Sequence, residues 1–139
     1  MGAWPYSQLT PLLFTSSLLP YHQPRMAINV LIVSYQPELL APHAEALVAA
    51  GYVVNSVKNM SAALGAVGPG KYEYMVLAHT TPTGDRRRIE GEAKRRNGNI
   101  RIILFYEGQP ERDVFVKQFV DITQPPSALV DCIDRLAQS

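Results

Sequence analysis

Polar side chains follow two apolar runs of the sequence, at the points where buried strands would end. Ser34 and Tyr35 come directly after the first run, and His79 and Thr80 come directly after the second. The hydroxyl groups of Ser34 and Thr80 can hydrogen-bond a small anion, and a histidine can accept a proton or a phosphoryl group. The same side chains can instead satisfy the backbone amides of the turns in which they lie. The sequence leaves both interpretations open.

A second group of side chains with possible chemistry is basic. Between positions 85 and 101 seven Lys and Arg residues outnumber three Asp and Glu residues, a local charge of +4 in a chain whose net charge is +1. Such a cluster can bind an acidic protein or a nucleic acid, or it can be a solvated helix face on which Arg88, Glu92 and Arg95 partly pair. No aromatic residue is interleaved, which argues against stacking on single-stranded nucleic acid. The candidate basic patch consists of Arg86, Arg87, Arg88, Lys94, Arg95 and Arg96.

Residues 29–51 form the unit around which the rest of the chain is organised. They open with the apolar run Val30–Val33, whose β-branched residues predict a strand that is buried on both faces. Helical spacing comes next, with Pro37 at the first helical position and Gly51 just after the last turn. A strand, a turn and a helix are half of a βαβ unit. The inward face of this helix is predicted to hold Leu39, Leu40, Ala44, Leu47 and Val48.

The alternation of strand and helix continues to the end of the chain. Only Ile89 and Ala93 form an apolar stripe in the basic segment, so that helix is expected to dock weakly. Five alternating strands and helices with right-handed crossovers require a parallel sheet covered by helices on both faces. Further strands are predicted at 52–57, 74–78, 100–105 and 119–123, and further helices at 59–67, 85–96, 110–117 (at most two turns) and 127–137.

The composition is that of one folded domain of ordinary size. The chain has 139 residues, of which 47% are hydrophobic and 18% charged. Cys132 is the single cysteine, which excludes an internal disulfide and, without a Cys/His cluster, a structural zinc site. A reducing, cytoplasmic setting is the simplest interpretation of a single cysteine. No run approaches the roughly 20 apolar residues that a membrane helix needs.

Residues 1–25 differ from the rest of the chain, because four prolines interrupt them and they show no periodicity. We expect a loosely ordered extension, or upstream sequence from a misassigned start with Met26 as the true first residue, ahead of a domain at 26–139. A signal peptide is disfavoured, since no basic residue precedes the apolar run. A third alternative is an arm that packs on the domain through Trp4, Leu12, Leu13 and Phe14.

After Met26 the sequence resembles response-regulator receiver domains. NVLIVSYQPELL and ALVAAGYVV are similar to the receivers' first strand, Leu-rich helix and Ala-Gly-Tyr step, where receivers typically read VLIVDDEP. YEYMVLAHTTPTGD is similar to their third strand and the loop after it, and VDITQPPSALVDCIDRL to their fifth strand, Lys-Pro step and last helix. The resemblance covers residues 28–136. It implies an α/β fold, a flavodoxin-like (βα)5 three-layer sandwich with strand order 2-1-3-4-5.

The resemblance also shows which residues this chain lacks. Receivers accept a phosphoryl group on an aspartate that ends the third strand, with a divalent cation held by an acidic pair after the first strand. The acidic pair aligns with Ser34 and Tyr35, the phosphoacceptor with Ala78, the switch Ser/Thr with Tyr106 and the lysine with Gln124. None of these side chains supports the family's chemistry. We therefore expect no metal ion, no cofactor and no aspartyl phosphorylation.

The sequence predicts a degenerate receiver, a non-enzymatic signalling domain of a two-component-type system that acts through protein contacts. A sensor kinase, an output protein or a second copy of the chain can be the partner, whereas no membrane or nucleic-acid partner is expected. One alternative is a small-ligand or nucleotide-binding domain that uses the crevice at Ser34, His79 and Thr80, although no Gly-rich phosphate loop supports it. The other is a regulator that contacts nucleic acid through the helix at 85–96.

Overall fold

Five parallel strands form one sheet in the computed structural model, which describes residues 28–110, 112–113 and 115–138. The order of the strands in the sheet is β3-β2-β4-β5-β6, and every neighbouring pair is parallel. Because β2 is the first of the five along the chain, this confirms the predicted order 2-1-3-4-5. The strands are β2 (Asn29–Val33), β3 (Val53–Val57), β4 (Tyr74–Leu77), β5 (Arg101–Tyr106) and β6 (Gln118–Asp121). The predicted extension at 1–25 lies outside the described residues, so its state stays a prediction.

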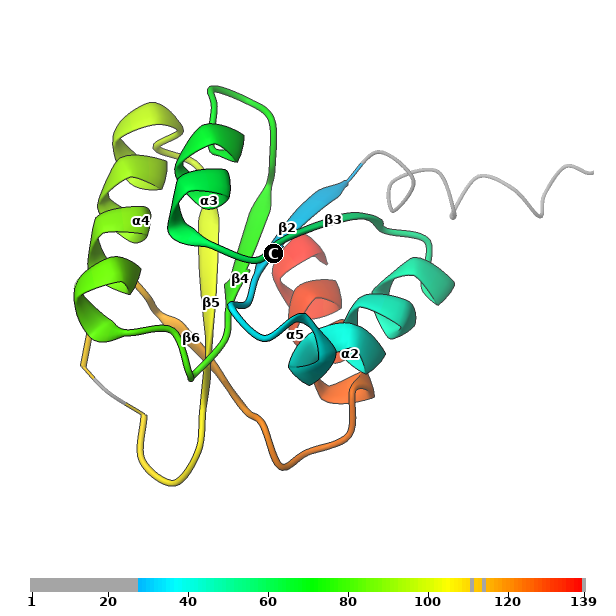
Figure 1. Ribbon diagram of the computed structural model, residues 1–139. Helices are drawn as coiled ribbons and strands as arrows, with labels where there is room; N and C mark the ends of the chain where they lie inside the picture. The colour runs from blue at the N-terminus through cyan, green and yellow to red at the C-terminus, as the bar shows by residue number, and fades with distance from the viewer. Residues whose placement is uncertain (1–27, 111, 114, 139) are drawn as a thin grey trace, which may run out of the picture.

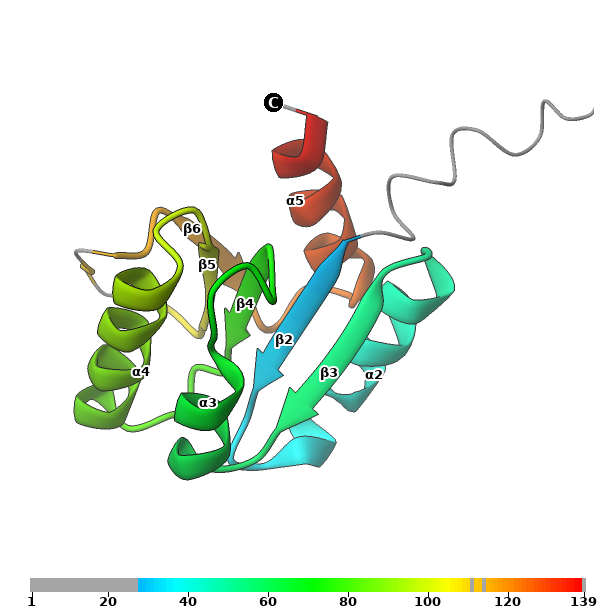
Figure 2. The ribbon, with the colours of Figure 1, turned by 90° about the horizontal axis from the view of Figure 1, so that it is seen from above.

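Helices cover both faces of the sheet and complete the three layers of the predicted sandwich (Figure 1). Helices α2 (Pro37–Ala49) and α5 (Ser127–Gln138) lie on one face, and α3 (Met60–Ala66) and α4 (Thr83–Arg96) lie on the other, as Figure 2 shows from above. Each helix pair closes its own apolar core against the sheet. The fully buried side chains include Leu47 and Ile133 in the α2/α5 core and Ile89 and Leu77 in the α3/α4 core.

Helix α2 begins and ends where its sequence signals predict. Pro37 is its first residue, and Gly51 follows the C-cap with a φ of 100°, a conformation that glycine adopts without strain. The predicted inward face is wrong at Val48, which is 59% exposed, while His43 is buried against Phe105. One residue turns an α-helix by about 100°. Val48 therefore points away from the sheet once its neighbour Leu47 faces the core.

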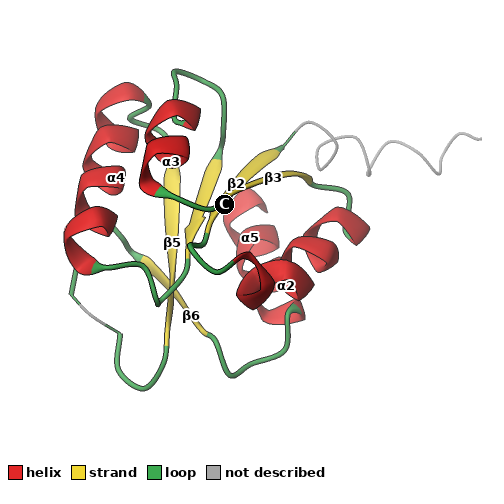
Figure 3. Cartoon of the chain, in the orientation of Figure 1, coloured by secondary structure: helices red, strands yellow, loops and turns green. Residues whose placement is uncertain are grey.

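The connection from β5 to β6 contains no helix among its described residues, so the predicted short helix at 110–117 is wrong (Figure 3). Pro110 cannot donate a backbone hydrogen bond. The Asp113 side chain accepts a hydrogen bond from the backbone N–H of Phe115 at 2.9 Å, which offers this segment a local alternative to helical bonding. Near β6 this face of the sheet is consequently covered by a loop, which buries Val116, and by the neighbouring α4.

Gly91 in the interior of α4 provides a test of how closely the β5–β6 connection packs on this helix. A Cβ added at Gly91 would meet the Cε2 atom of Phe115 at 3.9 Å, which is an ordinary van der Waals contact. We therefore expect Gly91→Ala to raise the free energy of unfolding by about 0.5–1 kcal/mol, because alanine loses less backbone entropy in a helix. Chemical denaturation measures the change. A loss of stability would show that Phe115 lies closer to α4 than described.

Candidate functional site

The carboxyl ends of β2 and β4 meet at one edge of the sheet, as the sequence predicts. Val33 pairs with Leu77, and the backbone N–H of Ala78 donates to the Val33 carbonyl at 3.0 Å. Ser34 and Ala78, the residues that follow the two strands, are therefore neighbours, and both are buried. The Ser34 hydroxyl donates to the Gln36 carbonyl at 2.7 Å and accepts from the Gln36 N–H at 3.3 Å. The Ser34 hydroxyl thus forms both of these hydrogen bonds within its own turn.

Tyr35 reaches from the loop after β2 to the first turn of α4. Its hydroxyl donates a hydrogen bond to Oδ2 of Asp85 at 2.8 Å. Burial raises the pKa of Tyr35 to about 12, and the hydrogen bond and charge of Asp85 add to the effect. The tyrosine is therefore a neutral donor at physiological pH. Nothing in the sequence pattern signals this contact, since the two residues are 50 positions apart.

Behind this edge lies a cavity of about 320 Å³ that His79, Thr81, Arg86 and Tyr106 help to line. Two of its lining residues have a buried side-chain atom without a hydrogen-bond partner among the described residues, namely His79 Nδ1 and Thr81 Oγ1. Thr80, which the sequence singles out as a possible ligand contact, is exposed and does not line the cavity. The neighbouring Thr81 takes its place. The local backbone direction decides which of two adjacent side chains faces inward, and a pattern of hydroxyl residues in a loop does not reveal it.

The two remaining positions implied by the resemblance lie further along the same edge. Tyr106 ends β5, and its ring stands edge-on to Phe119 with the ring centroids 6.5 Å apart. Gln124 is exposed in the turn after β6, where its backbone N–H donates to the Asp121 carbonyl at 3.1 Å. No group of three or more His, Cys, Asp or Glu side chains within the described residues is placed to hold a metal ion.

The predicted basic patch is not a single surface. Arg86 is only 3% exposed and belongs to the inner face of α4. Two of the others are paired, since Glu92 accepts from Arg95 at 2.6 Å and from Arg96 at 2.9 Å. The Lys94 ammonium donates to a backbone carbonyl. Of the six candidates, Arg87 and Arg88 are left as exposed guanidinium groups without an ion pair to another described residue.

Arg86 instead belongs to a buried charge cluster that sequence reasoning missed. Its guanidinium lies 3.3 Å from the Glu90 carboxyl and 3.4 Å from the Asp113 carboxyl, and the side chains are 4%, 0% and 2% exposed. Burial, followed by the hydrogen bond and charge of Asp113, raises the pKa of Glu90 to about 8, although Arg86 acts in the opposite direction. Near pH 7 Glu90 is thus a neutral acid that can share its proton with the Asp113 carboxylate. The cluster ties the β5–β6 connection to α4.

Helix α4 therefore docks through more than the two apolar residues that the sequence predicts. Arg86, Ile89, Glu90 and Ala93 are all buried and follow the i, i+3, i+4, i+7 spacing of one helix face. Half of that face consists of ionisable residues. A hydropathy pattern scores charged residues as solvent-facing, so it cannot indicate that a distant carboxylate makes their burial tolerable.

Comparisons with known proteins support the fold. No family model matches the chain, and no curated protein matches it either. One similar solved structure is the receiver domain of a sensor histidine kinase from Pseudomonas aeruginosa, which has a magnesium ion coordinated in its active-site cleft. Its sequence is 16% identical to this chain, and the TM-score is 0.68. The match covers 81% of this chain and 98% of that one. Other similar structures are described as response-regulator receiver proteins.

Two further similar structures carry different descriptions. A putative pilus assembly protein from Burkholderia thailandensis is 17% identical with a TM-score of 0.66 and covers 81% of this chain and 99% of that one. An adenylate cyclase from Rhodopirellula baltica is 15% identical with a TM-score of 0.65 and covers 79% of this chain and 87% of that one. At these identities the likeness concerns the fold alone. The chain has the flavodoxin-like fold that these response-regulator receiver domains share.

Proposed function

We propose that this chain is a degenerate receiver, a signalling domain that works through protein contacts and without aspartyl phosphorylation. The observation that carries the proposal is the edge formed by β2 and β4. The side chain of Ala78 is a methyl group. The Ser34 hydroxyl forms its hydrogen bond within its own turn, and the Tyr35 hydroxyl donates a hydrogen bond to Asp85. None of the three is a carboxylate that could take a phosphoryl group or bind a divalent cation.

Phosphorylation by a small acyl phosphate tests the proposal. We expect incubation with acetyl phosphate and Mg²⁺ to leave the intact mass unchanged, because Ala78, Ser34 and Tyr35 provide neither a carboxylate nucleophile nor a site for a charge-neutralising ion. The single variant Ala78→Asp is expected to remain unmodified, since the cation site is still missing. A matched positive control adds Ser34→Asp, Tyr35→Asp and Gln124→Lys to it. A gain of one phosphoryl mass by the unaltered chain, lost in His79→Ala, would contradict the proposal and identify His79 as the acceptor.

A second candidate function is the binding of a small ligand behind the same edge. The observation that favours it is the cavity of about 320 Å³. Two residues that line it, His79 and Thr81, each have a buried polar side-chain atom without a partner among the described residues. Buried polar atoms of this kind usually meet a hydrogen-bond partner, which can be water or a ligand. The ligand-binding and signalling hypotheses are compatible with each other.

The proposed setting is the cytoplasm, and the proposed partner is a protein such as a sensor kinase or an output protein. No described helix combines the length and the apolar character needed to cross a bilayer. The alternative of a nucleic-acid regulator loses support, because Arg86 is buried and Arg95 and Arg96 are paired with Glu92. We propose no enzymatic activity of the domain itself.

A further inference from the structure

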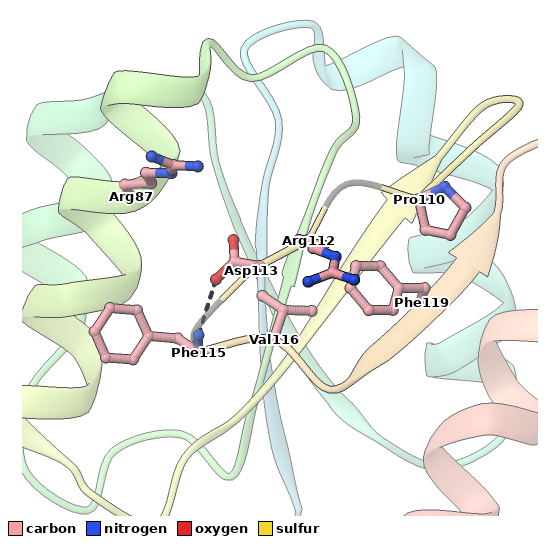
Figure 4. A pocket seen from close by; sticks show the side chains of 7 residues that line it. All are labelled: Arg87, Pro110, Arg112, Asp113, Phe115, Val116 and Phe119. Carbon is pink, nitrogen blue, oxygen red and sulfur yellow. Dashed lines mark hydrogen bonds between the residues drawn. The ribbon is translucent and has the colours of Figure 1, made fainter.

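A groove of about 770 Å³ lies between α4 and the connection from β5 to β6 (Figure 4). We call it the α4 groove. Its apolar lining comes from Pro110, Phe115, Val116 and Phe119, and its charged lining includes Arg87 and Arg112. The volume is within the range of about 300–1,000 Å³ that is usual for binding sites in proteins. It has room for several large side chains of another molecule.

The groove exists because no helix covers this part of the sheet. Strands β2, β3 and β4 are each followed by a helix that packs on the sheet, whereas the described residues between β5 and β6 form none. Two aromatic side chains remain incompletely covered as a result. Phe115 is 38% exposed, and Phe119 is only partly buried although it packs against the core beneath α3 and α4. Covering apolar surface of this kind with a partner lowers the free energy of the complex.

The accessible charge of the groove is positive. Arg87 and Arg112 are exposed, and neither forms an ion pair with another described residue. Asp113 also lines the groove, but its side chain is 2% exposed and lies against Arg86 in the buried cluster. In Figure 4 Arg87 projects from α4 on one side and Arg112 from the connection on the other. A ligand in the groove therefore meets both apolar side chains and two guanidinium groups.

We propose that the α4 groove binds an amphipathic helix of a partner protein, with apolar residues at i, i+3, i+4 or i+7 on the groove floor and Asp or Glu beside them. The apolar side chains replace those of the missing helix, and the carboxylates pair with Arg87 and Arg112. This inference rests on the proposed function and specifies the partner for it. The chain's own residues 1–27 contain no Asp or Glu and so lack the complementary charge.

Selection from a random peptide display library against the full chain at low salt tests this inference. We expect the enriched peptides to contain helical apolar spacing flanked by acidic residues. Synthetic versions of these peptides should bind the double variant Arg87→Glu, Arg112→Glu on the order of tenfold more weakly, since like charges then face each other. Arg88→Glu is the matched control, because Arg88 is exposed on the same helix and does not line the groove. It should change affinity less than about threefold.

Several outcomes would overturn the inference. An acidic helix in this groove would be excluded if no peptide is enriched, or if the enriched peptides lack acidic residues. It would also be excluded if neither Phe115→Ser nor the double charge variant weakens peptide binding. Displacement of a selected peptide by a synthetic peptide of residues 1–27 would make the occupant the chain's own segment. A dimer in light scattering that the double charge variant dissociates would make it a second copy. None of these results affects the phosphorylation assay, so the proposed function is judged separately.

Discussion

Replacing Arg86 with methionine is expected to lower the free energy of unfolding by about 3–5 kcal/mol, the usual cost of removing one partner from a buried ion pair. Arg86 lies 3.3 Å from Glu90 and 3.4 Å from Asp113, and all three side chains are nearly inaccessible to solvent. Without the guanidinium, the two carboxyl groups would retain a negative charge with no buried cation beside it. Most of the loss comes from this uncompensated charge and little from packing, because methionine retains much of the apolar volume.

Urea denaturation at neutral pH measures the loss, and the chain offers a matched control. Arg87→Met removes the same charge from the adjacent, exposed position of α4 and should change stability by less than about 0.5 kcal/mol. Arg86→Met combined with Glu90→Leu and Asp113→Asn should recover most of the loss, since a buried ion pair and an apolar replacement are often equivalent in stability. Equal small effects of Arg86→Met and Arg87→Met would show that the cluster is solvated.

Stability is expected to fall as the pH rises from about 6.5 to 8, with a slope of up to about 1.4 kcal/mol per pH unit. Burial raises the pKa of Glu90 from its ordinary value of 4.5 to about 8 in the folded chain. In this window the folded state keeps a proton on Glu90 that the unfolded state has already released. Each increase in pH therefore favours the unfolded state, until Glu90 is ionised in both states.

The window begins at about 6.5 because a second buried group acts in the opposite direction below it. Burial lowers the pKa of His43 from 6.5, so below that value the unfolded state binds the extra proton on this side chain, and the contribution of His43 to stability rises with pH. Below about pH 6.5 the contributions of Glu90 and His43 therefore oppose each other, and the fall in stability that Glu90 causes is steepest above that pH. Thermal melting at several pH values, at constant ionic strength, measures where the fall begins. The groups that face Glu90 are Arg86 and Arg87 on its own helix and Asp113 on the packed connection.

Glu90→Gln isolates the contribution of this one carboxyl group. Glutamine keeps the shape of the protonated acid and can still donate a hydrogen bond to Asp113, so we expect little change at pH 6.5. At pH 9 the variant should be more stable than the unaltered chain, because it has no proton to lose. Glu45→Gln, at an exposed position of α2, is the control and should leave the pH profile unchanged. A slope between pH 6.5 and 8 that survives in Glu90→Gln would assign the effect to another group.

Local signals in the sequence were sufficient to predict the layers of this protein. Apolar runs such as Val30–Val33 and Tyr74–Leu77 predict interior strands, because only a strand covered on both faces buries consecutive side chains. Helix boundaries follow from single residues, for example Pro37 at the start of α2 and Asn59, whose side chain accepts a hydrogen bond from the Ala62 N–H at 2.7 Å. The resemblance then added the strand order, which the structure confirms.

The sequence also placed Ser34, Ala78 and His79 at one edge, since the carboxyl ends of adjacent parallel strands must meet there. It could not predict what their side chains do. Tyr35 meets Asp85 only because α4 packs beside the loop after β2, and Thr81 replaces Thr80 in the cavity because of the local backbone direction.

Only the tertiary structure decided which charges are buried. Arg86 and Glu90 look like one more solvated pair in a basic helix, because helical spacing and composition describe neighbours within a few residues. Their burial depends on Asp113, whose carboxyl group lies 3.4 Å from Arg86. Asp113 belongs to the connection from β5 to β6, whose described residues form no helix. The same segment leaves Phe115 and Phe119 partly uncovered and so forms the α4 groove. Burial of a charge is tolerated only when its partner is in place, and a partner distant in sequence is set by the packing of the whole chain.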